Sequence, residues 1–159
     1  MTMRALCPQF GLIAIGSAVQ LAALLVCGTA AQAQPASVTS VRSLYVLHCA
    51  GCHAMDASGH PEQGVPSMRG VLGHFMRLPE GRAFLVQVPG VNNAGLSDEE
   101  IAKLTNWTVQ QFSAQTAPPG WAPYTAAEVA LAKQQRPLDV AKARADLVTR
   151  LRAAGVQMP

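Results

Sequence analysis

The strongest restriction on the fold of this chain comes from five residues, Cys49-Ala50-Gly51-Cys52-His53. The chain of 159 residues has four cysteines, and the other two, Cys7 and Cys27, lie in its apolar N-terminal stretch. If that stretch is removed, the two cysteines of the pentapeptide are the thiols that remain. Any bond that these two thiols form is then restricted to a pair of residues one helical turn apart, with a histidine directly after the second.

The N-terminal stretch has the layout of a secretory signal peptide. Arg4 supplies the positive start, residues 11–30 are predominantly apolar, and Ala31-Gln32-Ala33 places small residues where a signal peptidase cuts. We expect residues 1–33 to be cleaved and the mature protein to be periplasmic. The alternative is a retained membrane anchor, because about 20 apolar residues can span a bilayer.

Several kinds of chemistry use two cysteines separated by two residues. A thioredoxin-type redox pair accompanies a βαβ pattern, which this chain lacks, and a plain disulfide would close too short a loop to stabilise much. A structural zinc ion needs four ligands. No second Cys-x-x-Cys motif is present, and the further candidate ligands are His48, His60 and His74.

The pattern Cys-x-x-Cys-His is that of c-type haem attachment. Residues three apart lie on one face of a helical turn, so both thiols can reach the two vinyl groups of one porphyrin. The histidine that follows can then ligate the iron. We therefore predict one covalently attached haem held by Cys49 and Cys52, with His53 as an iron ligand.

Apolar periodicity and breaker residues predict an all-α fold. We expect a first helix from Val41 into the cysteines, then a stretch rich in glycine and proline, and a loop over residues 88–93 before the capping box Ser97–Glu100. Four more helices are expected, over residues 79–87, from 98 to about 112, 125–134 and 139–154. The predicted organisation is a signal peptide (1–33), a leader (34–40), a haem domain (41–113) and a Pro-rich connector with a helical extension (114–159).

The chain resembles the class I cytochrome c family over residues 41–112. Tyr45 fits the aromatic position of that family's N-terminal helix, and Leu104 and Trp107 fit positions of the C-terminal helix that crosses it. The segment 64–70 is similar to the loop in which a proline carbonyl accepts a hydrogen bond from the ligand histidine. Pro66 is our candidate for that proline.

The resemblance implies methionine as the second axial ligand, a pairing that raises the reduction potential. The family carries this methionine just before the last helix, where residues 88–93 of this chain have none. Met76 is the remaining candidate, and the alternative is an open or weakly ligated iron. Met55 lies too close to His53 in sequence to reach across the haem, Met68 is expected in the core, and Met158 is expected on a loose terminus. His60 and His74 could also ligate the iron through imidazole, although each is more typical of an exposed loop. His74 and Arg82 are candidates for a haem propionate, and His48 is expected to face solvent.

The expected function is electron transport rather than catalysis, between a dehydrogenase donor and an oxidase or cytochrome acceptor. Two alternatives are binding or sensing of a small ligand at an open iron, and an accessory haem subunit of a larger oxidoreductase. Without Arg4 the chain has 11 basic and 9 acidic residues, a balance that gives no reason to expect nucleic acid as a partner. Residues 114–159 are expected to add core to the haem domain, with a docking arm for a redox partner as the alternative.

Overall fold

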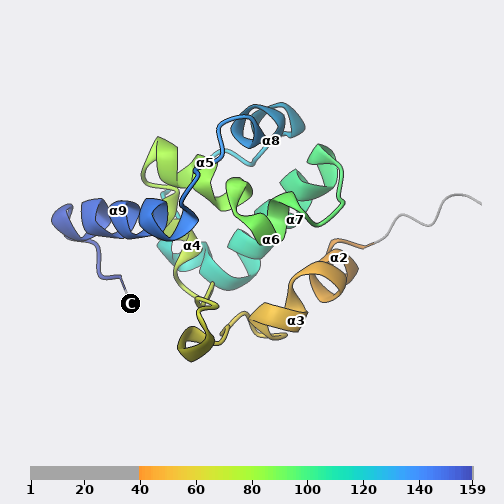
Figure 1. The fold of residues 1–159 in the computed structure, drawn as a ribbon, viewed down its shortest axis with the longest axis horizontal. Helices are drawn as coiled ribbons and strands as arrows, with labels where there is room; N and C mark the ends of the chain where they lie inside the picture. Colours follow the sequence, from red (N-terminus) through yellow and green to blue (C-terminus); the bar gives the residue numbers. More distant parts are fainter. Residues whose placement is uncertain (1–39, 159) are drawn as a thin grey trace, which may run out of the picture. The chain divides into compact units, whose positions relative to one another are not determined.

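The computed structural model describes residues 40–158, and their regular elements are helices (Figure 1). The only β pairing in this range is an isolated bridge between His60 and Val65. The all-α prediction is therefore confirmed. The predicted signal peptide and residues 34–39 of the predicted leader lie outside the described residues. None of the helices within 40–158 has the length and apolar character needed to cross a membrane.

The longer helices begin and end close to where the sequence predicts. The elements in chain order are α2 (Val41–His48), α3 (Ala50–His53), η1 (Pro61–Gln63), α4 (Leu72–Phe75), α5 (Pro79–Gln87), α6 (Pro89–Asn92), α7 (Asp98–Ser113), η2 (Ala114–Thr116), α8 (Ala126–Lys133) and α9 (Val140–Ala153). Between α3 and α5 no helix exceeds four residues, as the glycines and prolines of that stretch predict.

Side-chain caps explain several of these boundaries. Ser97 and Glu100 form the predicted capping box at the start of α7, each side chain accepting the other's backbone N–H. Thr125 caps α8 by accepting from the backbone N–H of Glu128, but the Glu128 carboxylate binds elsewhere. Asp139 caps α9 by accepting from Lys142 at 2.8 Å.

The segment 88–93 was expected as a loop, and this expectation is wrong in part. Pro89–Asn92 form one turn of helix, α6, and the backbone N–H of Asn93 donates to the carbonyl of Pro89 at 2.9 Å. Proline at the first helical position accounts for the turn, because its fixed φ suits a helix and its missing N–H has no partner there. A single turn carries too little periodicity for sequence reasoning to detect.

Helix α2 packs against α7 through an aromatic cluster. The ring of Tyr45, which is fully buried, lies 5.4 Å from that of Trp107 and 5.2 Å from that of Phe112. Leu44 and Leu104 complete the buried part of this contact. The prediction that Tyr45 of the first helix meets Leu104 and Trp107 of the later one is confirmed.

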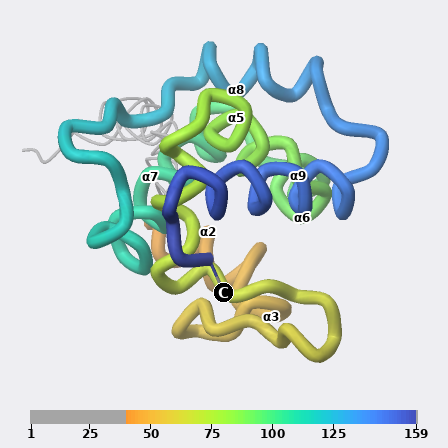
Figure 2. Tube along the Cα trace, turned by 90° about the vertical axis from the view of Figure 1, so that its left-hand side faces the viewer, coloured from red at the N-terminus to blue at the C-terminus, as the bar shows by residue number. Residues whose placement is uncertain are grey.

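The C-terminal helices add core to the rest of the fold (Figures 1 and 2). Leu147 and Leu151 of α9 are buried against Phe75 of α4 and Phe84 of α5. Tyr124 and the buried side chains of α8 join a second cluster, which contains Met76, Val86, Ile101, Ala102, Val109, Val129 and Ala132. The expected packing of the tail is confirmed, and a docking arm with an exposed apolar stripe is wrong. Met158, expected on a loose terminus, packs against the α9 cluster.

Helices α4 and α5 approach each other at a glycine. A Cβ added to Gly81 would collide with the backbone carbonyl of Phe75 in the preceding helix. Gly81 is buried, and Phe75 lies in the cluster that receives α9. The absence of a side chain at Gly81 therefore sets how closely α5 lies against α4, the surface on which α9 packs.

Candidate functional site

The two cysteines occupy one turn of helix at the end of α2. The backbone N–H of Cys49 still donates to Tyr45 of α2 at 2.9 Å, and the N–H of His53 donates to Cys49 at 2.9 Å. Between these bonds the chain bends, because Cys49 leaves helical geometry at φ −124°. Both cysteines are free thiols; Cys49 is half-buried and Cys52 is exposed.

His53 is oriented by the loop that follows α3. Its Nδ1 lies 3.2 Å from the backbone oxygen of Pro66, so Nδ1–H donates and Nε2 carries the free lone pair. Nε2 makes no hydrogen bond to a described residue. The contact between His53 and Pro66 was predicted, and the structure confirms it.

Burial lowers the pKa of His53 below its ordinary value, and the hydrogen bond to Pro66 opposes this effect in part. The imidazole is therefore held neutral near pH 7. Neutral imidazole is the form that binds a metal ion, and donation from the other ring nitrogen increases the basicity of the ligating nitrogen.

The loop around His53 is tied to the aromatic cluster. The hydroxyl of Tyr45 donates to the carbonyl of Ala54 at 2.7 Å, and burial, with smaller contributions from Cys49 and Asp56, raises the pKa of Tyr45 to about 12. The hydroxyl is therefore protonated and a donor at every ordinary pH. Ala54 needs this support, because its φ of 62° is unfavourable for a residue with a side chain.

Gly59 allows the loop to close on the carbonyl that His53 contacts. Its φ is +68°, and a Cβ there would lie 2.7 Å from the carbonyl oxygen of Pro66 and 2.6 Å from that of Val65. Sequence reasoning counted Gly59 only as one helix breaker among several. Ala57, two residues earlier, also has a positive φ. The close approach of Gly59 to residues 65–66 is set by the tertiary fold, so the local sequence does not reveal it.

The thiols are not activated as they are in redox-active cysteines. Burial raises the pKa of Cys49, and the nearby Cys52 raises it further. Reactive cysteine pairs of thiol oxidoreductases have lowered pKa values that favour the thiolate. The environment of Cys49 therefore gives no support to a thioredoxin-type reaction. No three His, Cys, Asp or Glu side chains within residues 40–158 gather closely enough to hold a metal ion.

Met76 lies in the protein core. Its side chain is 8% exposed and packs in the cluster that includes Val86 and Ile101. Met68 is half-buried against the α2–α7 contact, as expected, and Met55 is exposed. Iron ligation by Met76 stays a prediction.

Two buried polar atoms within the described residues have no hydrogen-bond partner. These are Nδ1 of His74 and Nδ2 of Asn92. His74 lies in α4 and not in an exposed loop, so that part of its prediction is wrong. Burial, with a smaller effect of Arg77, lowers the pKa of His74. Asn92 lies in the segment where the resemblance leads one to look for a methionine, and sequence reasoning did not single it out.

Arg82 is engaged away from the candidate site. Its guanidinium donates to the Glu128 carboxylate at 2.9 Å and lies 4.0 Å above the centre of the Tyr124 ring. The hydrogen bond that Arg82 donates to Glu128 raises the pKa of Arg82. The charge of Arg82 is already paired, and its role at a haem propionate stays a prediction. His48 and His60 are exposed, as expected.

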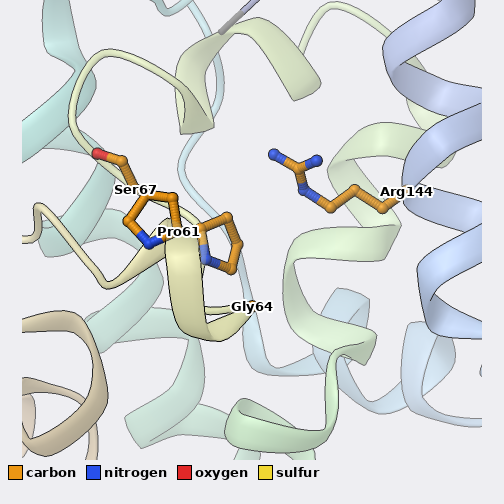
Figure 3. A pocket seen from close by; sticks show the side chains of 5 residues that line it. Pro61, Gly64, Ser67 and Arg144 are labelled. Atoms are coloured by element: carbon orange, nitrogen blue, oxygen red, sulfur yellow. The ribbon is translucent and has the colours of Figure 1, made fainter.

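An open cleft of about 350 Å³ lies beside the loop that holds His53. Its lining residues are Pro61, Gly64, Pro66, Ser67 and Arg144 (Figure 3). Arg144 extends from α9 toward the loop. The amphipathic pattern of the last helix indicates only that Arg144 lies on its polar side, and the distance in sequence hides its relation to Pro66.

The residues around Cys49 fit a covalently attached haem. Two free thiols lie three residues apart on one turn, and the next residue is a half-buried imidazole whose Nδ1 is held and whose Nε2 is free. Comparison of the chain with protein-family profiles, curated protein sequences and solved structures found no match.

Proposed function

We propose that this protein is an exported c-type cytochrome of class I that carries single electrons between a periplasmic dehydrogenase and a downstream acceptor. The observation that carries the proposal is the hydrogen bond from His53 Nδ1 to the carbonyl of Pro66 at 3.2 Å. It joins the Cys-x-x-Cys-His motif to a proline 13 residues later, the contact that the resemblance implies. The crossing of α2 and α7 through Tyr45 and Trp107 adds support.

Different residues around the motif would have different roles in binding the haem. Cys49 and Cys52 would bind haem through thioether bonds, and Nε2 of His53 would ligate the iron. When bound, the haem supplies a one-electron couple between ferric and ferrous iron. Pro66 orients the imidazole, and Tyr45 holds the backbone that follows it.

Exposed apolar side chains near the motif suit a carrier that meets partners briefly. Leu47 and Met55, on either side of the motif in sequence, are 71% and 54% exposed, and Cys52 is exposed between them. Short-lived electron-transfer complexes use small contact areas. The proposed partners are a dehydrogenase as donor and an oxidase or another cytochrome as acceptor, and the periplasmic location follows from the predicted signal peptide.

The test is haem staining of the exported protein after denaturing electrophoresis, followed by visible spectra of the reduced protein. We expect a stained band that disappears in Cys49→Ser/Cys52→Ser. His53→Ala should lose the low-spin spectrum, whereas the exposed neighbour His48→Ala should keep it. An unstained band from the wild-type chain, expressed in a host with a haem-attachment system, would rule out the proposed function.

A specific observation favours a second candidate function, ligand binding at an open iron. The segment 88–93 has no methionine, and the side chain of Met76 is packed among aliphatic residues. Carbon monoxide distinguishes the candidates. If the reduced wild-type protein ignores the gas and Met76→Ala binds it, while Met68→Ala does not, Met76 is the distal ligand. Rapid binding by the wild type would favour the ligand-binding function.

The alternative of an accessory subunit fixed through its tail has less support. The apolar stripe of α9 packs against its own chain through Leu147 and Leu151, so it is not free to join a larger protein. Co-purification with one large partner at high salt would restore this alternative.

A further inference from the structure

Arg144 is a half-buried cation without a carboxylate partner. Three arginine or lysine residues within 40–158 are half-buried: Arg82, Lys133 and Arg144. Arg82 is paired with Glu128, and Lys133 with Asp98 at 2.8 Å. Arg144 makes no hydrogen bond or ion pair with another described residue, and its nearest charge-stabilising contact is the Phe75 ring, 6.0 Å away.

The fold holds Arg144 at the cleft. Leu147, Val148 and Leu151 fix α9 against α4 and α5, and the guanidinium points toward the loop that carries Ser67 and Gly64 (Figure 3). The other residues that line the cleft are uncharged. A partly desolvated guanidinium facing a neutral cleft favours an anion there, because burying a charge without a partner is unfavourable.

The cleft and the candidate iron ligand share a residue. Pro66 lines the cleft, and its carbonyl accepts the hydrogen bond from His53. We propose that the cleft between α9 and the loop 61–67 is an anion site in which Arg144 binds a haem propionate carboxylate. This inference rests on the proposed function. It gives the C-terminal extension a role in the site, because the cation comes from a helix outside the segment that resembles a cytochrome.

A positive charge at this position stabilises the reduced state of the site. Ferric haem carries one more positive charge than ferrous haem, so a neighbouring guanidinium favours the ferrous form and also compensates the propionate. Removing the charge should shift the equilibrium toward the ferric form by about tenfold, which for a one-electron couple lowers the midpoint potential by about 59 mV.

The experiment measures the midpoint potential of the purified holoprotein by spectroelectrochemistry, in the wild type and three variants. Arg144→Gln removes the proposed partner, and Arg144→Lys keeps a positive charge in the same place. Arg150→Gln removes a charge from the same helix, where Arg150 pairs with Glu80 on the exposed surface at 3.4 Å. Circular dichroism checks that each variant keeps its helices.

A fall of about 59 mV in Arg144→Gln, most of it recovered in Arg144→Lys and absent in Arg150→Gln, would support the proposal. Equal potentials in the two glutamine variants would overturn it while leaving the proposed function intact. A wild-type potential that varies with inorganic phosphate at constant ionic strength, with no such effect in Arg144→Gln, would assign the cleft to a free anion instead. A wild-type chain without covalent haem would overturn the proposed function, and with it this inference, before any variant is compared.

Discussion

At the residue scale, the hydrogen bonds around His53 explain how a short motif acquires a defined geometry. The imidazole is held from one side by Pro66, and the backbone after it is held by Tyr45. The sequence allowed the first contact to be predicted, because the resemblance supplied the proline. The second could not be predicted, because nothing local indicates that the Tyr45 hydroxyl reaches Ala54.

Tyr45→Phe should destabilise the protein by about 1–2 kcal/mol, because the part-buried carbonyl of Ala54 loses its donor while the ring packing is kept. Urea unfolding followed by circular dichroism measures the change in the free energy of unfolding. Tyr124→Phe is the comparison, since it removes a bond to Arg82 O of 2.9 Å at another place. We expect a similar loss of stability in both variants but a changed visible spectrum only in Tyr45→Phe. Unchanged stability in Tyr45→Phe would contradict the assigned role of its hydroxyl.

At the element scale, the long helices follow from sequence and the one-turn helices do not. Capping residues and apolar periodicity locate α5, α7 and α9 to within a few residues. α4 and α6 have four residues each, about one turn, so the 3.6-residue apolar period has no room to repeat within them. Their positions depend on tertiary contacts, such as the close approach at Gly81.

Gly81→Ala should destabilise the protein by about 1–3 kcal/mol, because the new methyl group collides with the backbone of Phe75, which cannot move aside as a side chain can. Gly90→Ala is the control, since a Cβ at Gly90 meets nothing within 4 Å in helix α6. That change should be neutral or stabilise by up to about 1 kcal/mol. Thermal unfolding of both variants provides the measurement, and equal midpoints would show that α4 can shift to accommodate the methyl group.

Helices α5 and α8 are joined by the pair of Arg82 and Glu128. Glu128→Gln should destabilise the protein by about 1–3 kcal/mol, because the half-buried guanidinium loses its charged partner. The matched control is Asp146→Asn, which breaks an exposed, solvent-screened pair with Lys142 and should leave stability nearly unchanged. Chemical denaturation at low and high salt measures both. A larger loss of stability in Asp146→Asn than in Glu128→Gln would contradict the prediction that the half-buried pair contributes more than the exposed one.

At the scale of the whole molecule, residues after 113 complete the hydrophobic cores rather than forming one of their own. Tyr124 and Val129 share a cluster with Met76 and Val86 from the preceding segment. The amphipathic pattern of the last helix predicts that its apolar face packs against the rest of the protein. The pattern does not indicate that the contact surface is formed by α4 and α5. The cleft at Arg144 was hidden for the same reason, since it depends on where α9 lies.

Leu151→Ala should destabilise the whole protein by about 2–4 kcal/mol, because Leu151 is 1% exposed in the cluster with Phe75 and Phe84. Leu138→Ala makes the same chemical change at a fully exposed position and should have little effect. Unfolding is followed by circular dichroism and by tryptophan fluorescence, which reports on Trp107 and Trp121. Coincident, destabilised transitions in Leu151→Ala are expected. Separate transitions would mean that α9 unfolds independently of the rest.

Because α9 follows the cysteine motif in the chain, the order of synthesis also sets an order of events in time. A ribosome completes the Cys-x-x-Cys-His segment several seconds before it reaches α9, at about 5–20 residues per second. During synthesis the motif and the loop with Pro66 therefore exist for a period without the helix that carries Arg144. The cleft gains its far wall only when α9 packs, whereas Cys52 is exposed with α9 in place, so access to this cysteine does not end when the helix arrives.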